Sequence, residues 1–335
     1  MKSSRIATFV LCFFLALLTS LAQQPTPGQA PIATATTPPQ SPVEQIRRTV
    51  GFLTVAYQDG SSTKGVIGTC FFVGVPDKRL GEENQSFIYL VTNRHVAQPG
   101  IDLGTAYPVL GAFLRLNLDT PQGEVQSVQQ RIAPVNQLRW HFPKDDAVDL
   151  AILPLAPDEK IYSYLVIPSS RIVTSDQVKA GDVVVGDRVV FAGYFSNFPG
   201  QKRIEPIIRE GVIAMLPDET LDTTLHKPGQ LYLADLHAFH GNSGAPVLVN
   251  VGVGGTPHHG TIIIGENYLL LGLISGYYPE SVGFSVPAAT VLTGEVRDNS
   301  GIATIVPADE LNKLLNSGEV QAERDRYVAN LPKKP

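Results

Sequence analysis

Cysteine is nearly absent from this chain. Only Cys12 and Cys70 occur among its 335 residues. Cys12 lies within an apolar run near the N-terminus, so Cys70 has no partner for a disulfide once that run is removed. An exported protein without disulfides depends on its hydrophobic core for stability. We therefore interpret Cys70 as a buried, unreactive residue rather than a nucleophile.

Basic clusters and long apolar segments are also lacking. The formal net charge is −5, and the only adjacent pair of basic residues near the end of the chain is Lys333 and Lys334. A nucleic-acid-binding protein needs a Lys- and Arg-rich face to neutralise phosphates. The sequence therefore predicts that the protein does not bind nucleic acid. No segment after the N-terminal run is long and apolar enough to span a bilayer, which needs about 20 residues.

The N-terminus has the pattern of a secretory signal peptide. Lys2 and Arg5 precede the apolar residues 6–18, and small residues follow at 20–22. The apolar run is short for a membrane span, so we favour cleavage after Ala22 over a retained anchor. Residues 1–22 are thus predicted to be a signal peptide, and the mature protein is predicted to be secreted or periplasmic, with no stable membrane insertion.

The remaining chain indicates an all-β protein. Residues 23–44 are rich in Pro, Thr and Gln and predict a disordered linker. Short β-branched and aromatic runs separated by turn residues then predict two β-barrels, at 45–170 and 171–305, with the site in the cleft between them. Residues 306–335 predict a C-terminal helical tail, beginning at Pro307. The predicted strands are residues 50–57, 66–75, 87–92, 109–116, 150–155, 188–193, 207–215, 231–236 and 262–275.

Three segments carry residues suited to catalysis. A predicted strand runs directly into His95, Asp149 stands at the head of an apolar strand, and Ser243 lies in a glycine-flanked loop. A serine hydroxyl needs a base to take its proton, and histidine titrates in the right range to accept and return it. A buried carboxylate would hold the imidazole tautomer. Backbone N–H groups of Gly241 and Ser243 would form an oxyanion hole.

These segments resemble a known family. Residues 241–246, Gly-Asn-Ser-Gly-Ala-Pro, resemble the Gly-Asp-Ser-Gly-Gly-Pro box of trypsin-like serine peptidases, with the Asn variant similar to the bacterial high-temperature-requirement (Deg) branch. Residues 91–95 and 68–73 resemble that family's histidine segment and the strand before it. The order His, Asp, Ser also differs from that of subtilisins and α/β-hydrolases. The resemblance implies two six-stranded antiparallel β-barrels and an endopeptidase that acts on polypeptides without a cofactor.

Two assignments keep alternatives. Asp145 and Asp146 are rivals to Asp149 as the triad acid, although their neighbour Lys144 favours solvated loop charges. A catalytically weak binding or scaffold protein with the same fold is the alternative function. His237 and His240 have a spacing that metal sites use, but no third ligand is evident, so we predict no metal.

The resemblance also implies which residues shape the substrate pocket. They are His237, Ala238, Ser275, Gly276, Tyr277 and Gly283. None is acidic, so the pocket offers no partner for a lysine or arginine side chain. We expect small or medium aliphatic residues at the cleaved bond, and acidic residues as a second choice because His237 can be protonated.

The segment after Arg48 has a faint similarity to the activation-cleavage site of trypsin-like zymogens. In those zymogens the new amino terminus pairs with the Asp before the nucleophile. The corresponding residue here is Asn242, which carries no charge. We therefore expect an enzyme that needs no cleavage at Arg48.

Overall fold

The computed structural model describes residues 41–81, 85–119, 127–252, 267–286 and 292–331. The predicted signal peptide and most of the predicted linker lie outside these residues. The first described element is helix α1 (Pro42–Arg48), whose N-cap Ser41 accepts a hydrogen bond from the Glu44 backbone N–H at 3.2 Å. Proline in the first turn suits this helix start. Helix α1 thus begins within the last residues of the predicted linker, before its boundary at 44/45.

The first half of the fold is a seven-stranded sheet. Its strands follow the order β5-β4-β1-β2-β3-β6, and β7 pairs with β2. The bounds are β1 (Val50–Asp59), β2 (Ser62–Pro76), β3 (Ser86–Thr92), β4 (Val109–Asn117), β5 (Ser127–Arg131), β6 (Ala151–Pro154) and β7 (Ile167–Pro168). The expectation of a six-stranded first barrel is thus corrected to a larger, mostly antiparallel sheet.

Strand β6 lies at one end of this sheet. Within the described part of the chain, β6 pairs with β3 on one side. On its other side Ile152 exchanges both backbone hydrogen bonds with His141, at 2.9 and 3.0 Å. The backbone groups of Ile152 that would meet another strand are therefore already satisfied.

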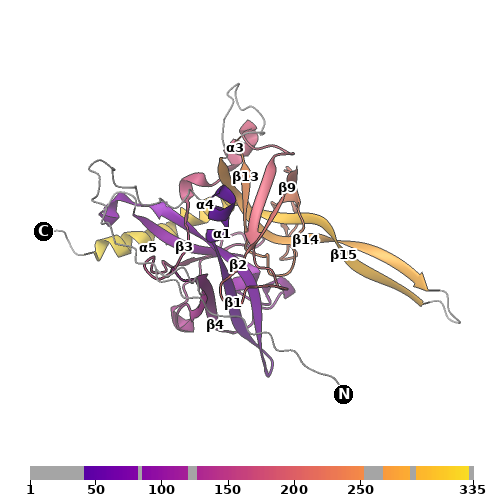
Figure 1. Cartoon of the computed structure of the whole chain (residues 1–335), viewed down its shortest axis with the longest axis horizontal. Helices are drawn as coiled ribbons and strands as arrows, with labels where there is room; N and C mark the ends of the chain where they lie inside the picture. The colour runs from indigo at the N-terminus through magenta and orange to yellow at the C-terminus, as the bar shows by residue number, and fades with distance from the viewer. Residues whose placement is uncertain (1–40, 82–84, 120–126, 253–266, 287–291, 332–335) are drawn as a thin grey trace, which may run out of the picture. The chain divides into compact units, whose positions relative to one another are not determined.

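The second half is a closed antiparallel barrel of six strands, as predicted. Its order is β12-β15-β14-β13-β8-β9. The bounds are β8 (Arg188–Gly193), β9 (Ile207–Met215), β12 (Tyr232–Asp235), β13 (Pro246–Asn250), β14 (Tyr268–Val286) and β15 (Leu292–Pro307). Strands β14 and β15 continue past the barrel as a two-stranded ribbon (Figure 1).

Short elements connect these sheets. Helix α3 (Ser175–Ala180) begins with a capping box between Thr174 and Gln177, and it lies just after the predicted boundary between the barrels at 170/171. Strands β10 (Leu221–Asp222) and β11 (Pro228–Gly229) form a small hairpin. The other short elements are α2 (Arg94–Ala97), η1 (Lys78–Leu80), η2 (Ile101–Leu103), η3 (Val135–Gln137) and η4 (Ser169–Arg171).

The chain ends in two helices that pack across both halves. Helix α4 (Ala308–Leu315) follows Pro307, and α5 (Gly318–Ala329) lies further along the segment predicted as a helical tail. Buried side chains of both helices join a core cluster that contains Phe71 of the first half and Leu270 of the second. This shared apolar cluster fixes the two halves against each other. No helix in the described ranges is long and apolar enough to cross a membrane.

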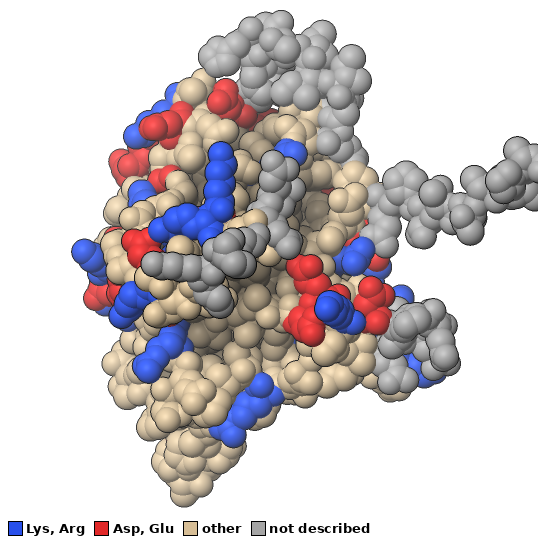
Figure 2. Space-filling model, turned by 90° about the vertical axis from the view of Figure 1, so that its left-hand side faces the viewer, with Lys and Arg blue, Asp and Glu red and all other residues tan. Residues whose placement is uncertain are grey.

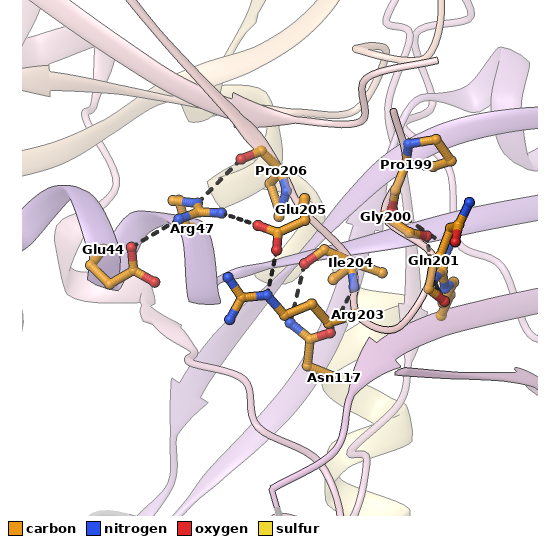
Figure 3. A network of polar contacts seen from close by, with 11 residues as sticks. Glu44, Arg47, Asn117, Pro199, Gly200, Gln201, Arg203, Ile204, Glu205 and Pro206 are labelled. Carbon is orange, nitrogen blue, oxygen red and sulfur yellow. Dashed lines mark hydrogen bonds and ion pairs between the residues drawn. The ribbon is translucent and has the colours of Figure 1, made fainter. Parts of the chain in front are cut away.

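Helix α1 is tied to the second barrel by a cluster of charged side chains (Figure 3). Arg47 contacts Glu205 at 2.7 Å and Glu44 at 3.1 Å, and its Nε donates to the Pro206 carbonyl at 3.2 Å. Arg203 also pairs with Glu205. These contacts hold helix α1 beside the residues that precede β9. Each of the partly exposed ion pairs contributes little to the free energy of folding.

Candidate active site

Pairing between β3 and β6 brings His95 and Asp149 together. Thr92 pairs with Ala151, so the turns that follow β3 and precede β6 lie side by side. His95 Nδ1 lies 2.7 Å from Asp149 Oδ2, and the His95 backbone N–H donates to Oδ1 at 3.0 Å. Asn93 donates from Nδ2 to the Asp149 carbonyl at 2.7 Å. One carboxylate therefore fixes both the ring and the backbone of the histidine.

Asp149 is deeply buried, with 1% of its surface exposed. Burial raises the pKa of this carboxyl, but the charge and hydrogen bonds of His95 and the Ser275 hydroxyl outweigh burial and leave the pKa below its ordinary value. Burial likewise lowers the pKa of His95, whereas the Asp149 charge and hydrogen bond raise it, with a net rise. The pair is thus arranged to stabilise an imidazolium next to a carboxylate.

The two other candidate acids do not reach the histidine. Asp145 accepts a hydrogen bond from the Ala147 backbone N–H at 3.0 Å, and Asp146 pairs with Lys227. Both side chains belong to the exposed loop before β6. The geometry therefore favours Asp149 as the residue that orients His95.

Ser243 lies in a loop whose shape requires glycine. Gly241 and Gly244 have φ values of +93° and +84°, in the left-handed region. A Cβ on Gly241 would lie 2.4 Å from the Tyr194 ring, and one on Gly244 would lie 2.2 Å from the Thr69 carbonyl oxygen. Across the described residues, the backbone N–H groups of Gly241 and Ser243 find no acceptor. Both donors are available to a ligand.

The Ser243 hydroxyl approaches the Ser275 carbonyl at 3.4 Å and makes no hydrogen bond to His95 in this structure. His95 belongs to the first half and Ser243 to the second, yet both line one cleft. Without substrate, the hydrogen bond between a nucleophile and its base is often long or poorly aligned.

Thr69 of β2 attaches the serine loop to the first sheet. Its backbone N–H donates to the Ser243 carbonyl at 2.8 Å, and its hydroxyl donates to the Gly241 carbonyl at 2.7 Å. The same hydroxyl accepts a hydrogen bond from the Tyr194 backbone N–H at 2.9 Å. The sequence analysis did not identify Thr69, and its position before Cys70 offers no signal for this role.

Asn242, the residue before Ser243, is held in place by hydrogen bonds of its uncharged amide. Asn242 is 1% exposed. Its Oδ1 accepts from the Phe239 backbone N–H at 2.8 Å, and its Nδ2 donates to the Tyr194 carbonyl at 2.7 Å. The amide therefore finds a donor and an acceptor within the folded chain.

The cleft has a volume of about 800 Å³. Its walls come from both halves, and Asp102 and Asp222 place carboxylates along it. Three predicted pocket residues, Ser275, Gly276 and Tyr277, lie on it. The other lining residues are Gly65, Val66, Ile67, His95, Val96, Thr223, Thr224, His226, Phe239, His240, Gly241, Ser243, Ile274, Tyr278, Pro279 and Thr304.

The other three predicted pocket residues lie elsewhere. His237 is exposed beside Gly301 and lines a separate groove with Arg209 and Glu210. Ala238 is buried in the core of the second barrel. Gly283 is paired with Glu295 on the ribbon, with no atom near the position of a Cβ. His237 and Ala238 follow the end of β12, and Gly283 lies in the ribbon part of β14, so these three residues are not among those that line the cleft.

Charges of both signs are mixed on the face shown in Figure 2. Lys and Arg side chains lie among Asp and Glu side chains, and this view shows no continuous basic surface over the described residues. The described residues also contain no group of three or more His, Cys, Asp and Glu side chains arranged to hold a metal ion.

The trypsin-like peptidase domain model matches residues 68–252, which is more than half of the chain. The chain belongs to this family, and the membership supports a protease function.

Two solved structures are similar in fold. The crystal structure of Deg5 is 16% identical and covers 70% of this chain and 82% of its own, with a TM-score of 0.40. The HtrA-type protease AlgW with a tripeptide is 14% identical and covers 84% of this chain and 63% of its own, with a TM-score of 0.45. No curated protein sequence matches the chain.

Proposed function

We propose that the chain is a secreted serine endopeptidase in which His95, Asp149 and Ser243 form the catalytic triad. The observation that carries the proposal is the buried His95–Asp149 pair, with its 2.7 Å contact, on the same cleft as Ser243. The backbone N–H groups of Ser243 and Gly241 find no acceptor among the described residues. Each component has a known use in acyl transfer.

The reaction follows from these positions. His95 Nε2 takes the proton of Ser243 as the hydroxyl oxygen attacks the substrate carbonyl carbon. The N–H groups of Gly241 and Ser243 stabilise the negative oxygen that develops, and losing one such donor costs about 10²–10³ in rate in other enzymes. His95 then returns the proton to the leaving amine, and water releases the acyl group by the same steps.

The substrate is a polypeptide cut after a small or medium aliphatic residue. Gly276 and Tyr277 line the cleft together with Ser243. Asp222, a carboxylate on the cleft, is 69% exposed at its side chain and therefore lies in water rather than in a buried pocket for a cation. The second choice of an acidic residue loses its basis, because His237 lies in another groove.

A catalytically weak binding protein is the second candidate. The observation in its favour is that Ser243 Oγ contacts the Ser275 carbonyl and not His95. Labelling of the purified mature chain with a fluorophosphonate separates the two candidates, because the probe reacts with an activated serine only.

We expect the wild-type chain to be labelled and to cleave casein, and Ser243→Ala and His95→Ala to abolish both while thermal unfolding stays cooperative. Casein cleavage by Ser243→Ala at the wild-type rate would show that the nucleophile is misassigned. Export is tested separately by N-terminal sequencing of the mature chain, for which we expect residue 23 as the first.

A further inference from the structure

Ser275 adds a further hydrogen bond to the candidate triad at Asp149. The Ser275 hydroxyl donates to Asp149 Oδ2 at 2.7 Å. A hydroxyl has a single proton, and a carboxylate can only accept. The Ser275 oxygen lies 2.6 Å from Thr224 Oγ1. Since the Ser275 proton is already used, Thr224 must be the donor in this second contact. The order of donation is Thr224 to Ser275 to Asp149.

Thr224 is held in a tight turn at the tip of the β10–β11 hairpin. The His226 backbone N–H donates to the Thr223 carbonyl at 2.8 Å, and the Thr223 N–H donates to the Lys227 carbonyl at 3.0 Å. His226 has a φ of +55°, the only positive value among described residues other than glycine. A backbone conformation that a non-glycine residue rarely adopts persists only where its surroundings enforce it.

The hairpin is also attached to the segment that leads into Asp149. Lys227 pairs with Asp146. A Cβ on Gly229 would lie 3.2 Å from the Ala147 side chain, so the two backbones pack closely. The turn that carries Thr224 therefore packs against the loop that leads to Asp149, and the exposed Lys227–Asp146 pair adds little to this packing.

We propose that Thr224 is a positioning residue of the active site, which acts on Asp149 through the Ser275 hydroxyl. This proposal rests on the proposed peptidase function. By donating to Ser275, Thr224 fixes the rotamer in which the serine proton points at the carboxylate. A hydroxyl group that accepts a hydrogen bond also becomes a stronger donor, so the bond from Ser275 to Asp149 is strengthened. Asp149 is thereby stabilised in the orientation that binds both the ring and the backbone of His95.

The test is the kinetics of Thr224→Val, which keeps the side-chain shape and removes the donor. We expect kcat to fall about fivefold, equivalent to about 1 kcal/mol for one hydrogen bond, with KM within about twofold of wild type. Without the Thr224 hydrogen bond, Ser275 holds Asp149 less firmly in the orientation that binds His95, so Asp149 raises the pKa of His95 less. The acidic limb of the kcat/KM profile should therefore move down by about 0.3 pH unit. Asp102, the other acid that acts on His95, is unchanged in every variant.

Two further variants make the test specific. Thr224→Ser keeps the hydroxyl and should restore both kcat and the acidic limb. Thr63→Val is the matched control, because the Thr63 hydroxyl also donates a hydrogen bond, to Gln58 Oε1 at 3.4 Å, but lies on an exposed part of β2 outside the cleft. This control should leave the acidic limb in place. The downfield proton resonance of His95 Nδ1 should shift in Thr224→Val only, and this signal does not depend on turnover.

A wild-type kcat, acidic limb and Nδ1 resonance in Thr224→Val would overturn the proposal. So would a higher KM and a lower melting temperature with an unchanged limb, since these would show a merely structural role. Failure of the peptidase proposal looks different: the wild-type chain itself would be inactive, or Ser243→Ala would retain activity.

Discussion

Replacement of Asp149 by asparagine is the most informative substitution in this protein. The carboxylate accepts from the His95 ring and the Ser275 hydroxyl at Oδ2, each at 2.7 Å, and from the His95 backbone N–H at Oδ1, at 3.0 Å. An asparagine has one acceptor oxygen and one NH₂ group. The backbone N–H cannot give up its proton, so the asparagine oxygen will face it. The NH₂ group then faces His95 Nδ1.

This orientation of the asparagine stabilises the catalytically wrong tautomer of the His95 ring. His95 Nδ1 must accept a hydrogen bond, so the ring proton moves to Nε2, which can no longer take the proton of Ser243. The same exchange in a peptidase with a Ser-His-Asp triad costs about 10⁴ in kcat, equivalent to about 5.4 kcal/mol. We expect a loss of that order. The acidic limb of the residual activity should fall to lower pH, because Asp149 is what raises the pKa of His95 against the effect of burial.

The assay is steady-state cleavage of a peptide substrate from pH 4 to 10, with thermal unfolding of each variant. Asp146→Asn is the matched control. It removes the same charge from an exposed side chain paired with Lys227, and activity should stay within about threefold of wild type. If Asp149→Asn were within tenfold of wild type, or if Asp146→Asn were the more damaging change, the assignment of the triad acid would be refuted.

Three more predictions use the same protein. Arg48→Ala should leave activity unchanged without any cleavage, because the Asn242 amide is satisfied by Phe239 and Tyr194; activity that appears only after trimming to Thr49 would contradict this. Cys70 is fully buried, and burial raises the pKa of its thiol, so a thiol reagent should react only after unfolding and dithiothreitol should not change the melting temperature. A peptide-library digest should show cleavage after Ala, Val or Leu, and dominant cleavage after Lys or Arg would show that the cleft is misread.

Much of the fold was accessible from local patterns. The strand predicted at 188–193 coincides with β8, and that at 207–215 with β9, because alternating or continuous apolar runs between turn residues specify strands locally. The helical tail predicted at 306–335 is divided in the structure into α4 and α5. The buried residues of α5 are Val320 and Arg324, so its pattern lacks an apolar stripe that would mark its own bounds.

Local sequence patterns could not predict which residues line the candidate pocket. The direction of a side chain on a strand depends on register, and β14 has register shifts between Ile274 and Gly276 and between Tyr277 and Pro279. Each shift changes the face on which later residues lie. The length of the ribbon likewise carried Gly283 away from the cleft, which no spacing rule could anticipate.

The sequence by itself determined the chemistry: a histidine after one strand, an aspartate before another and a serine in a loop that only glycine allows. These features are local, since each depends on a few adjacent residues. Only the tertiary structure decided that Ser275, 126 residues from Asp149, donates to it, and that Thr224 donates to Ser275. Hydrogen bonds between distant residues depend on which strands pair and in what register, and that is settled by the packing of the whole core.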